Sequence, residues 1–437
     1  MDIDKKIRIT PGLIISLLIV LIPSFAWIIG FEFGDRTTFE VVGVSIEKTA
    51  AFAGIAMYGW SLILSGRYKF LDNWFRGLDK VYIAHRFFGT AAVGLLLLHP
   101  LGNTMDYVSS QGTGTLIQHY FGFTGVATLL GRISLYGLVL VGLWSIFAKV
   151  KHETFIRVHR WLGVLFIIGA VHAFMSGPES VLANNPFMWW YVLILSIAAA
   201  LTFIHFSLLG NFLHPYYKYR LVSVKQLPGE VIDFELDPVY RIADFKPGQF
   251  FYISFDELDK DIYHPFSVAS SKYDSRLRFV IKQLGDHTTA MKDLTAGGKA
   301  RVKGPYGGFT FNDKKHPKQL WLAGGIGVTP FMSKAHSLRF TNLSTHVKMF
   351  HFARNEAEAI DKEQLSMIEK DHRAFDYTCI PQDKFGIISL KDIEEQIGSL
   401  KDYAIYMCGP PGMLQAYEQQ AKELGVDKQL YYEEFDY

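Results

Sequence analysis

Residues 81–100 read VYIAHRFFGTAAVGLLLLHP, an apolar run with a histidine near each end, His85 and His99. A helix needs about 20 mainly apolar residues to cross a bilayer, so this run predicts a membrane span. Histidines inside a membrane are costly and are often functional. Fourteen residues separate the pair, which places the two side chains roughly 20 Å apart along a helix. The stretch therefore predicts a helix that carries one imidazole at each of two depths in the membrane.

A second apolar run, VHRWLGVLFIIGAVHAF (158–174), carries His159 and His172 thirteen residues apart. Both runs are expected to cross the membrane in the same direction, so His85 lies level with His159 and His99 with His172. Two neutral imidazoles that face each other suit a six-coordinate haem iron, which carries electrons with little change in geometry. We therefore predict one haem site at each level. The alternative is that these histidines are hydrogen-bonded packing residues.

Ligand number favours this prediction, whereas helical phase alone does not prove it. A zinc site needs three or four ligands at one place, whereas each level offers two histidines, and we expect no acid beside them within the spans. Thirteen residues fall about 0.4 of a turn short of a whole number of turns, so the helix of His159 and His172 needs tilt or a local irregularity. His119, expected in an outer loop, and His205, in the last span, are interpreted as structural residues.

The 437-residue chain divides into an apolar first half and a second half that reads as a soluble α/β protein. A net charge of +2 gives no electrostatic support for nucleic-acid binding. The two cysteines, Cys379 and Cys408, cannot form a disulfide framework and lack CxxC metal-site spacing. Six runs in the first half are long and apolar enough to cross a bilayer: 11–30, 41–65, 81–101, 128–148, 157–175 and 188–210.

Basic residues gather in the N-terminal tail and in the 66–80 and 149–160 loops. The positive-inside rule then predicts a multi-pass protein of the cell membrane, in contact with lipid, with both termini in the cytoplasm. The start of the chain has no small-residue cleavage site, so we expect no signal peptide. On the outer side, Arg132 is the only obvious cation, near the start of the fourth span.

The second half is expected to contain two domains. Short β-rich runs separated by Gly, Pro and Asp up to about residue 312 predict a small antiparallel barrel: YRLVSVKQL, QFFYISF and RLRFVIKQL. The strand-like runs QLWLAGG, HVKMFHFA and YAIYMCG then alternate with helical ones, which predicts a parallel sheet with crossover helices. The expected domains are 1–212, 213–312 and 313–437.

The segment HPFSVAS (264–270) is a candidate flavin site. In a barrel strand it can place Phe266 against a flavin ring and Ser267 toward the polar edge of that ring; otherwise it is a strand with a proline at its edge. The candidate residues are His264, Pro265, Phe266, Ser267, Val268, Ala269 and Ser270. Gly285 and Thr288, in GDHTTAM (285–291), lie at a probable helix start, where phosphate is favoured. The turn GPYGGF (304–309) can also approach a pyrophosphate or be a simple turn.

The segment WLAGGIGVTPF (321–331) is a candidate dinucleotide site, because glycines after a strand permit close approach of a pyrophosphate at a helix start. It is not the GxGxxG fingerprint. Arg354 follows the next strand, where it can meet a ribose or a 2′-phosphate. Cys408 ends a strand in YMCGPPGM (406–413), which is the edge at which α/β proteins bind ligands. The candidate residues are Gly324, Gly325, Gly327, Thr329, Pro330, Arg354, Cys408, Gly409 and Pro410.

Together these motifs resemble the NADPH oxidase and ferric reductase superfamily, over nearly the whole chain. The likeness rests on the order HPFS, GGIGVTP, CGPPG and on the histidine spacings of 14 and 13 residues. The chain is most similar to the compact bacterial oxidases, which lack a Ca²⁺-binding extension. The resemblance implies a six-helix all-α membrane bundle followed by a ferredoxin-NADP reductase-like module, with an antiparallel β-barrel FAD domain and an α/β nucleotide-binding domain.

The resemblance also implies cofactors and roles. These are FAD at the HPFS segment, NADPH or NADH at GGIGVTP and CGPPG, and two b-type haems, on His85 with His159 and on His99 with His172. Phe435 matches the C-terminal aromatic that covers the flavin, and Phe435 and Cys408 are the expected catalytic residues. Electrons would pass from NAD(P)H through FAD and the haems to O₂ on the outer face, forming superoxide, with no obligatory cytosolic activator.

Two alternatives remain at this point. In the animal oxidases a further histidine lies four residues after the outer ligand of the third helix, and here that position is Asn103. A ferric-chelate reductase that uses the same electron path is therefore the first alternative. The second is a haem-binding membrane subunit that donates electrons to a partner protein, although such a subunit would not need its own flavin and nicotinamide segments.

Overall fold

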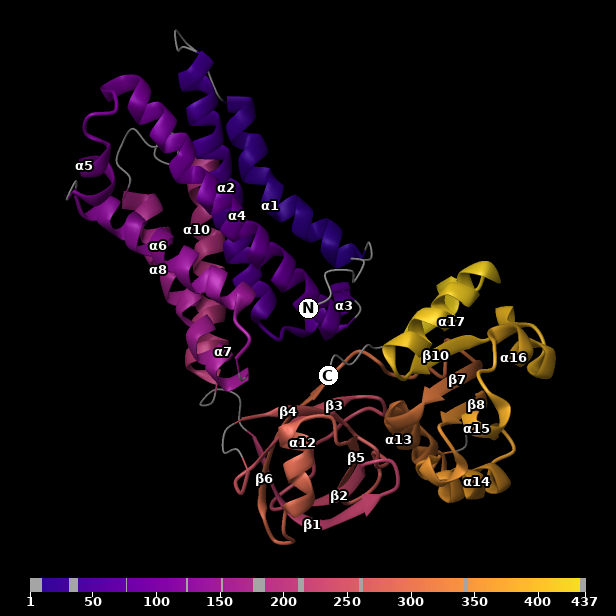
Figure 1. Cartoon of the computed structure of the whole chain (residues 1–437). Coiled ribbons are helices and arrows are strands. Elements are labelled where there is room, and N and C mark those ends of the chain that lie inside the picture. Colours follow the sequence, from indigo (N-terminus) through magenta and orange to yellow (C-terminus); the bar gives the residue numbers. More distant parts are fainter. Residues whose placement is uncertain are drawn as a thin grey trace. The chain divides into compact units, whose positions relative to one another are not determined.

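The structure is a computed structural model that describes residues 10–30, 38–75, 77–122, 125–150, 152–175, 185–210, 216–258, 262–341 and 345–432. The chain divides into two compact units, Met1–Leu213 and His214–Tyr437. The first unit is helical, and the second combines an antiparallel barrel with a parallel sheet flanked by helices (Figure 1).

The described part of the first unit consists of helices and their connections. The helices are α1 (Pro11–Gly30), α2 (Thr38–Ser65), α3 (Lys69–Phe75), α4 (Leu78–Gln111), α5 (Leu116–Phe121), α6 (Val126–Phe147), α7 (His152–His159), α8 (Trp161–Met175), α10 (Pro186–Thr202) and the π-helical segment η1 (Phe203–Leu208). Six stretches of described residues are long and apolar enough to cross a membrane: 11–30, 38–65, 80–109, 126–147, 154–175 and 186–208. The prediction of six spans is confirmed.

Helices α2 and α4 pack closely against each other because glycines line their contact. A Cβ on Gly102 of α4 would clash with the backbone of Glu47 on α2, and one on Gly54 would meet the side chain of Leu96. Small residues allow membrane helices to approach to backbone contact. The consequence here is that backbone carbonyls of α2 come within reach of side chains on α4.

The first part of the second unit is an antiparallel sheet that closes into a barrel. Its strands are β1 (Tyr217–Leu227), β2 (Val231–Pro238), β3 (Phe250–Phe255), β4 (His264–Ser267), β5 (Leu277–Lys282) and β6 (Lys299–Tyr306), in the order β4-β3-β6-β1-β2-β5. A bridge between Val268 and Phe279 joins the two ends of that order. Phenylalanines such as Phe234, Phe251 and Phe279 fill the interior. The short helices α12 (Asp286–Ala290) and η2 (Met291–Asp293) follow β5.

The second part of this unit is a parallel five-stranded sheet. Its strands are β7 (Lys318–Gly324), β8 (His346–Ala353), β9 (Phe375–Pro381), β10 (Ala404–Cys408) and β11 (Leu430–Tyr432), in the order β11-β10-β7-β8-β9. The helices and helical turns are η3 (Gly325–Val328), α13 (Thr329–Leu338), η4 (Glu356–Glu358), α14 (Lys362–Asp371), α15 (Gln382–Phe385), α16 (Leu390–Ile397), η5 (Leu400–Asp402), α17 (Pro411–Glu423) and η6 (Asp427–Gln429). The strand order reverses between β7 and β10, and such a switch point is where doubly wound sheets bind ligands.

The two parts of this unit share one apolar core. On one face of the parallel sheet, Trp321 and Phe331 pack together with Val231, Ala269 and Phe309 from the barrel side. Leu320, Phe350 and Tyr417 form a second cluster on the opposite face. The barrel and the parallel sheet are therefore held against each other by buried apolar surface, which is non-directional, and by the polar contacts described later.

Candidate cofactor sites

His85 and His159, which the sequence predicts to lie at the same level, are close to each other in the structure. The ring centroids of His85, on α4, and His159, at the end of α7, are 6.0 Å apart. With metal–imidazole bonds of about 2 Å, the ring centres of two ligands on opposite sides of one metal ion stand roughly 6 Å apart. The separation of the two rings therefore fits one metal ion held between them.

Backbone carbonyls of α2 orient both histidines of α4. Nδ1 of His85 lies 2.8 Å from the carbonyl oxygen of Ser61, and Nδ1 of His99 lies 3.1 Å from that of Glu47. A carbonyl can only accept, so each Nδ1 carries the proton and each Nε2 keeps its lone pair for a metal. Glu47 and Ser61 are fourteen residues apart, like the two histidines, because α2 runs alongside α4.

The histidines of the α7–α8 region are oriented in a similar way by α6. Nδ1 of His172 lies 2.8 Å from the carbonyl oxygen of Ala127, and Nδ1 of His159 lies 3.2 Å from Oγ of Ser145. The helix is interrupted at Arg160, between α7 and α8. That break supplies the local irregularity that the thirteen-residue spacing requires.

The second depth contains a cavity of about 600 Å³. His99 and His172 both line it, together with apolar side chains such as Phe52, Leu135 and Phe166. Two imidazoles among these apolar side chains fit a planar, mostly apolar macrocycle with a central metal, while polar side chains such as Asn103 and Arg132 line other parts of the cavity. Among the described residues, no group of three His, Cys, Asp or Glu side chains could hold a metal ion, so a metal site of the zinc type finds no support there.

The expectation that no acid lies beside the histidines within the spans is wrong for this cavity. Glu47 is only 6% exposed, lines the cavity and pairs with Lys48 at 2.8 Å. Their burial depends on the packing of α2 against α4, which no local pattern of the sequence shows.

His119 and Arg132 also lie at this cavity. His119 lines the cavity, and its Nε2 lies 2.8 Å from Oδ1 of Asn103. The guanidinium of Arg132 donates to the carbonyls of Gly122 and His119, so it ties the α5 segment to α6. Lys48 is a second cation at this cavity, which the sequence argument did not anticipate.

The glycine-rich segments of the second unit meet at the switch point of the parallel sheet. Gly324 ends β7 and Cys408 ends the neighbouring strand β10. A Cβ on Gly327 would clash with the backbone of Cys408 and Gly409, and one on Gly324 would clash with Met413 and Pro410. Both loops therefore need glycine to lie backbone to backbone.

A groove of about 180 Å³ opens beside these loops. Gly324, Gly325, Arg354 and Pro410 line its nucleotide-domain wall, as expected for neighbouring strand ends. Lys282 of β5 and the β1–β2 turn line the barrel wall and were not anticipated. Of the other candidate residues, Gly327, Thr329, Pro330 and Cys408 are buried behind the groove, and Gly409 is partly buried.

The candidate flavin segments lie next to each other on the barrel. The ring of His264, at the start of β4, stacks on that of His287 in α12 with centroids 3.6 Å apart. Thr288 caps α12 by accepting from the backbone nitrogen of Gly285 at 3.1 Å. Pro265 is exposed, and Phe266 and Ser267 are half-buried.

The second half of the HPFSVAS segment is buried. Val268 and Ala269 belong to the apolar cores. Oγ of Ser270 accepts from the backbone nitrogen of Arg278 at 3.0 Å, and its carbonyl accepts from Oγ of Ser333 at 2.7 Å. A flavin role for these three residues remains a prediction, and in the structure Ala269 and Ser270 connect the barrel to α13. Phe435 lies outside the described residues.

Comparisons with known protein families divide the chain into a membrane part, a flavin part and a nucleotide part, as the structure does. Residues 50–170 match the family described as ferric reductase like transmembrane component. Residues 216–348 match the FAD-binding domain family, and residues 321–419 match the oxidoreductase NAD-binding domain family.

Relatives of more than one kind are similar to this chain. Glycine betaine monooxygenase reductase subunit of Chromohalobacter salexigens is 28% identical over 44% of this chain and 55% of its own. Respiratory burst oxidase homolog protein F of Arabidopsis thaliana is 22% identical over 72% of this chain and 39% of its own. Ferric reduction oxidase 5 of the same plant is 26% identical over 52% and 31%. The chain spans less than two thirds of the length of these relatives.

Proposed function

The chain belongs to the NADPH oxidase and ferric reductase superfamily, and we therefore propose that it is a transmembrane NAD(P)H oxidase that reduces O₂ to superoxide on the outer face of the membrane. Bound FAD would split the two-electron donor into single electrons, and two haems would carry them across the bilayer. The second unit, with both termini, would lie on the cytoplasmic side.

One observation carries this proposal. Two imidazole pairs are present at two depths of the helical unit, and every Nδ1 among them has a carbonyl or hydroxyl oxygen as neighbour. A histidine that ligates a metal usually makes such a hydrogen bond through the ring nitrogen that is not the ligand, because this bond sets the tautomer and the direction of the lone pair. The same Nδ1 arrangement at all four histidines therefore supports two metal centres.

The residues of the second unit would have separate tasks. The backbone of Gly324 and Gly325, at the start of a helical turn, would accommodate the pyrophosphate of the nicotinamide nucleotide. Arg354, at the end of β8, would meet the ribose or a 2′-phosphate, which favours NADPH. Phe266 and Ser267 would contact the flavin ring, Cys408 would lie next to the nicotinamide, and Phe435 would cover the flavin.

A ferric-chelate reductase is the second candidate, and the cavity at the second depth favours it. Lys48 supplies a cation there, and Asn103 occupies the position where the animal oxidases have a histidine. Arg132 adds a second positive charge and Glu47 offsets one of the two, so the lining keeps a net positive charge, which suits an anionic ferric chelate at least as well as neutral O₂. The same electron path would serve either acceptor.

Turnover of the purified full-length protein tests the proposal. NADPH oxidation is measured with and without superoxide dismutase and ferric citrate, in air and without oxygen. An oxidase gives a dismutase-sensitive signal in the absence of iron, whereas a ferric reductase continues to reduce ferric citrate without oxygen.

The matched variants are His99→Ala and His172→Ala. Each should lose the outer haem and the reduction of the outer acceptor, while NADPH still reduces the flavin. Unchanged haem content in both variants would contradict the ligand assignment. Failure of the wild-type protein to oxidise either nicotinamide nucleotide would contradict the proposed function itself.

A further inference from the structure

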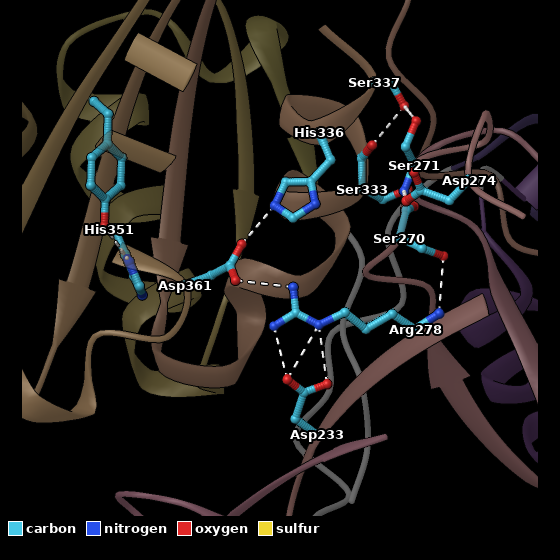
Figure 2. Close-up of polar contacts among 11 residues, drawn as sticks. Asp233, Ser270, Ser271, Asp274, Arg278, Ser333, His336, Ser337, His351 and Asp361 are labelled. Atoms are coloured by element: carbon cyan, nitrogen blue, oxygen red, sulfur yellow. Dashed lines mark hydrogen bonds and ion pairs between the residues drawn. The ribbon is translucent and has the colours of Figure 1, made fainter. Parts of the chain in front are cut away.

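A buried charge cluster joins the barrel to the nucleotide domain within the second unit (Figure 2). Arg278 of β5 donates from Nε and one terminal nitrogen to Asp233 of β2, at 3.1 and 2.9 Å. Its other terminal nitrogen donates to Oδ1 of Asp361, just before α14, at 3.0 Å. His336 of α13 completes the cluster, with Nε2 lying 2.6 Å from Oδ2 of Asp361.

The cluster is well shielded from water. The side chain of Asp361 is 2% exposed and that of His336 8%, while Arg278 and Asp233 are 16% and 13% exposed. Burial alone would raise the pKa of Asp361, but the hydrogen bond from His336 and the charge of Arg278 outweigh it and hold that pKa below its ordinary value. Asp361 is therefore a carboxylate at neutral pH, although it is buried.

Such a cluster specifies geometry more than it adds stability. Removing charges from water offsets most of the attraction between them, so buried ion pairs are weak evidence for stability. The guanidinium fork is planar and rigid, however, and it satisfies two carboxylates from different domains only at one relative position. The apolar contacts between the same domains carry no such directional demand.

Three members of the cluster lie close in the chain to residues that line the nucleotide groove. On β2, Asp233 follows the groove residue Val231 by two positions, and on β5, Arg278 precedes the groove residue Lys282 by four. Asp361 immediately follows the groove residue Ile360, and its backbone is left-handed, with φ 61°. Asp233, Arg278 and Asp361 are thus each within four residues of a residue that lines the groove.

We propose that Arg278 is a positioning residue that sets the separation of the two walls of the nucleotide groove, by bonding to Asp233 on the barrel wall and to Asp361 on the opposite wall. The inference rests on the proposed function, because it names what holds that site in shape. Without the guanidinium, the two carboxylates repel each other across the domain boundary, and the groove loses the geometry that fits the nucleotide.

The test uses the purified full-length protein and two kinds of measurement. One is the equilibrium dissociation constant of NADP⁺, which needs no turnover, and the other is the KM and kcat for NADPH with ferricyanide as acceptor. Since a displacement of about 1 Å can cost up to about 100-fold in rate, we expect Arg278→Met to raise the dissociation constant and the KM on the order of tenfold.

Arg276→Met is the matched control. Arg276 lies immediately before the same strand, β5, and pairs with Glu235 and Asp237 of β2, but its side chain is 47% exposed. The Arg276→Met variant should bind NADP⁺ with the same dissociation constant as the wild type. Arg278→Lys keeps the positive charge but removes the planar guanidinium. This variant replaces Arg278→Met in the test if the methionine variant does not retain flavin. We expect it to weaken NADP⁺ binding as well.

The outcomes are distinct. An Arg278 variant that melts at a lower temperature but binds NADP⁺ as tightly as the Arg276 control would overturn the inference, since the cluster would then be structural only. A wild-type protein that does not bind NADP⁺ would instead overturn the proposed function and remove the premise of the inference.

Discussion

At the scale of single residues, His351 is the most deeply buried titratable side chain that the proposed activity does not use. It lies on β8 with no exposed surface, and its Nδ1 is 3.0 Å from the hydroxyl oxygen of Tyr377. Burial lowers its pKa from 6.5 to about 4, although the nearby charge of Asp361 acts in the opposite direction. The folded protein therefore holds this imidazole neutral.

This burial predicts a pH-dependent stability. Because the folded pKa is lowered, the unfolded chain binds the extra proton first, and stability falls as the pH drops from 6.5 toward 4. Between pH 6.5 and 5 the loss should be about 2 kcal/mol. Urea unfolding of the second unit at several pH values measures it.

His351→Phe should flatten the pH dependence over this range. His346→Phe, which replaces an exposed histidine at the start of the same strand, should leave it unchanged. Equal slopes for His351→Phe and the wild type would show that another group causes the acid sensitivity.

At the scale of elements, several strands were predictable because their signal is local. The runs YRLVSVKQL, QFFYISF, RLRFVIKQL, QLWLAGG, HVKMFHFA and YAIYMCG coincide with β1, β3, β5, β7, β8 and β10. Strands β9 and β11 were not predicted individually. Both lie at the edges of the parallel sheet, and β11 is only three residues long. Edge strands have less of the continuous apolar pattern that marks a buried strand.

The crossing of α6 and α8 yields a second prediction. The backbone of Gly131 on α6 lies so close to the ring of His172 that an added Cβ would be 2.7–2.9 Å from it. Gly131→Ala should therefore displace the ring and perturb the absorption or reduction potential of one haem. Gly94→Ala on α4, where a Cβ would meet nothing within 4 Å, is the control. Identical haem spectra and potentials in both variants would contradict the proposed role of His172.

At the scale of the whole molecule, each unit has its own apolar cores. The barrel and sheet clusters contain residues of the second unit alone, and the cluster around Trp27 and Met188 contains residues of the first. We expect a fragment of residues 214–437 to fold, bind flavin and reduce ferricyanide with NADPH. It should not reduce acceptors through haem. A fragment that is soluble but has no cooperative thermal transition would contradict this expectation.

The sequence by itself determined the features that depend on neighbouring residues. Span length, histidine spacing, strand periodicity and the glycine loops are all local patterns, and the six spans and the two-part second unit follow from them. The resemblance to a superfamily rested on the same short motifs.

Tertiary structure alone decided which side chains meet. The carbonyl of Glu47 reaches His99 because α2 and α4 pack at glycines, and Arg278 reaches Asp361, which is eighty-three residues further along the chain, because two domains share a core. Neither contact can be predicted from neighbouring residues, because each depends on which faces of distant elements are buried together. That packing makes Glu47 and Lys48 part of the lining of a cavity and makes Arg278 a link between two domains.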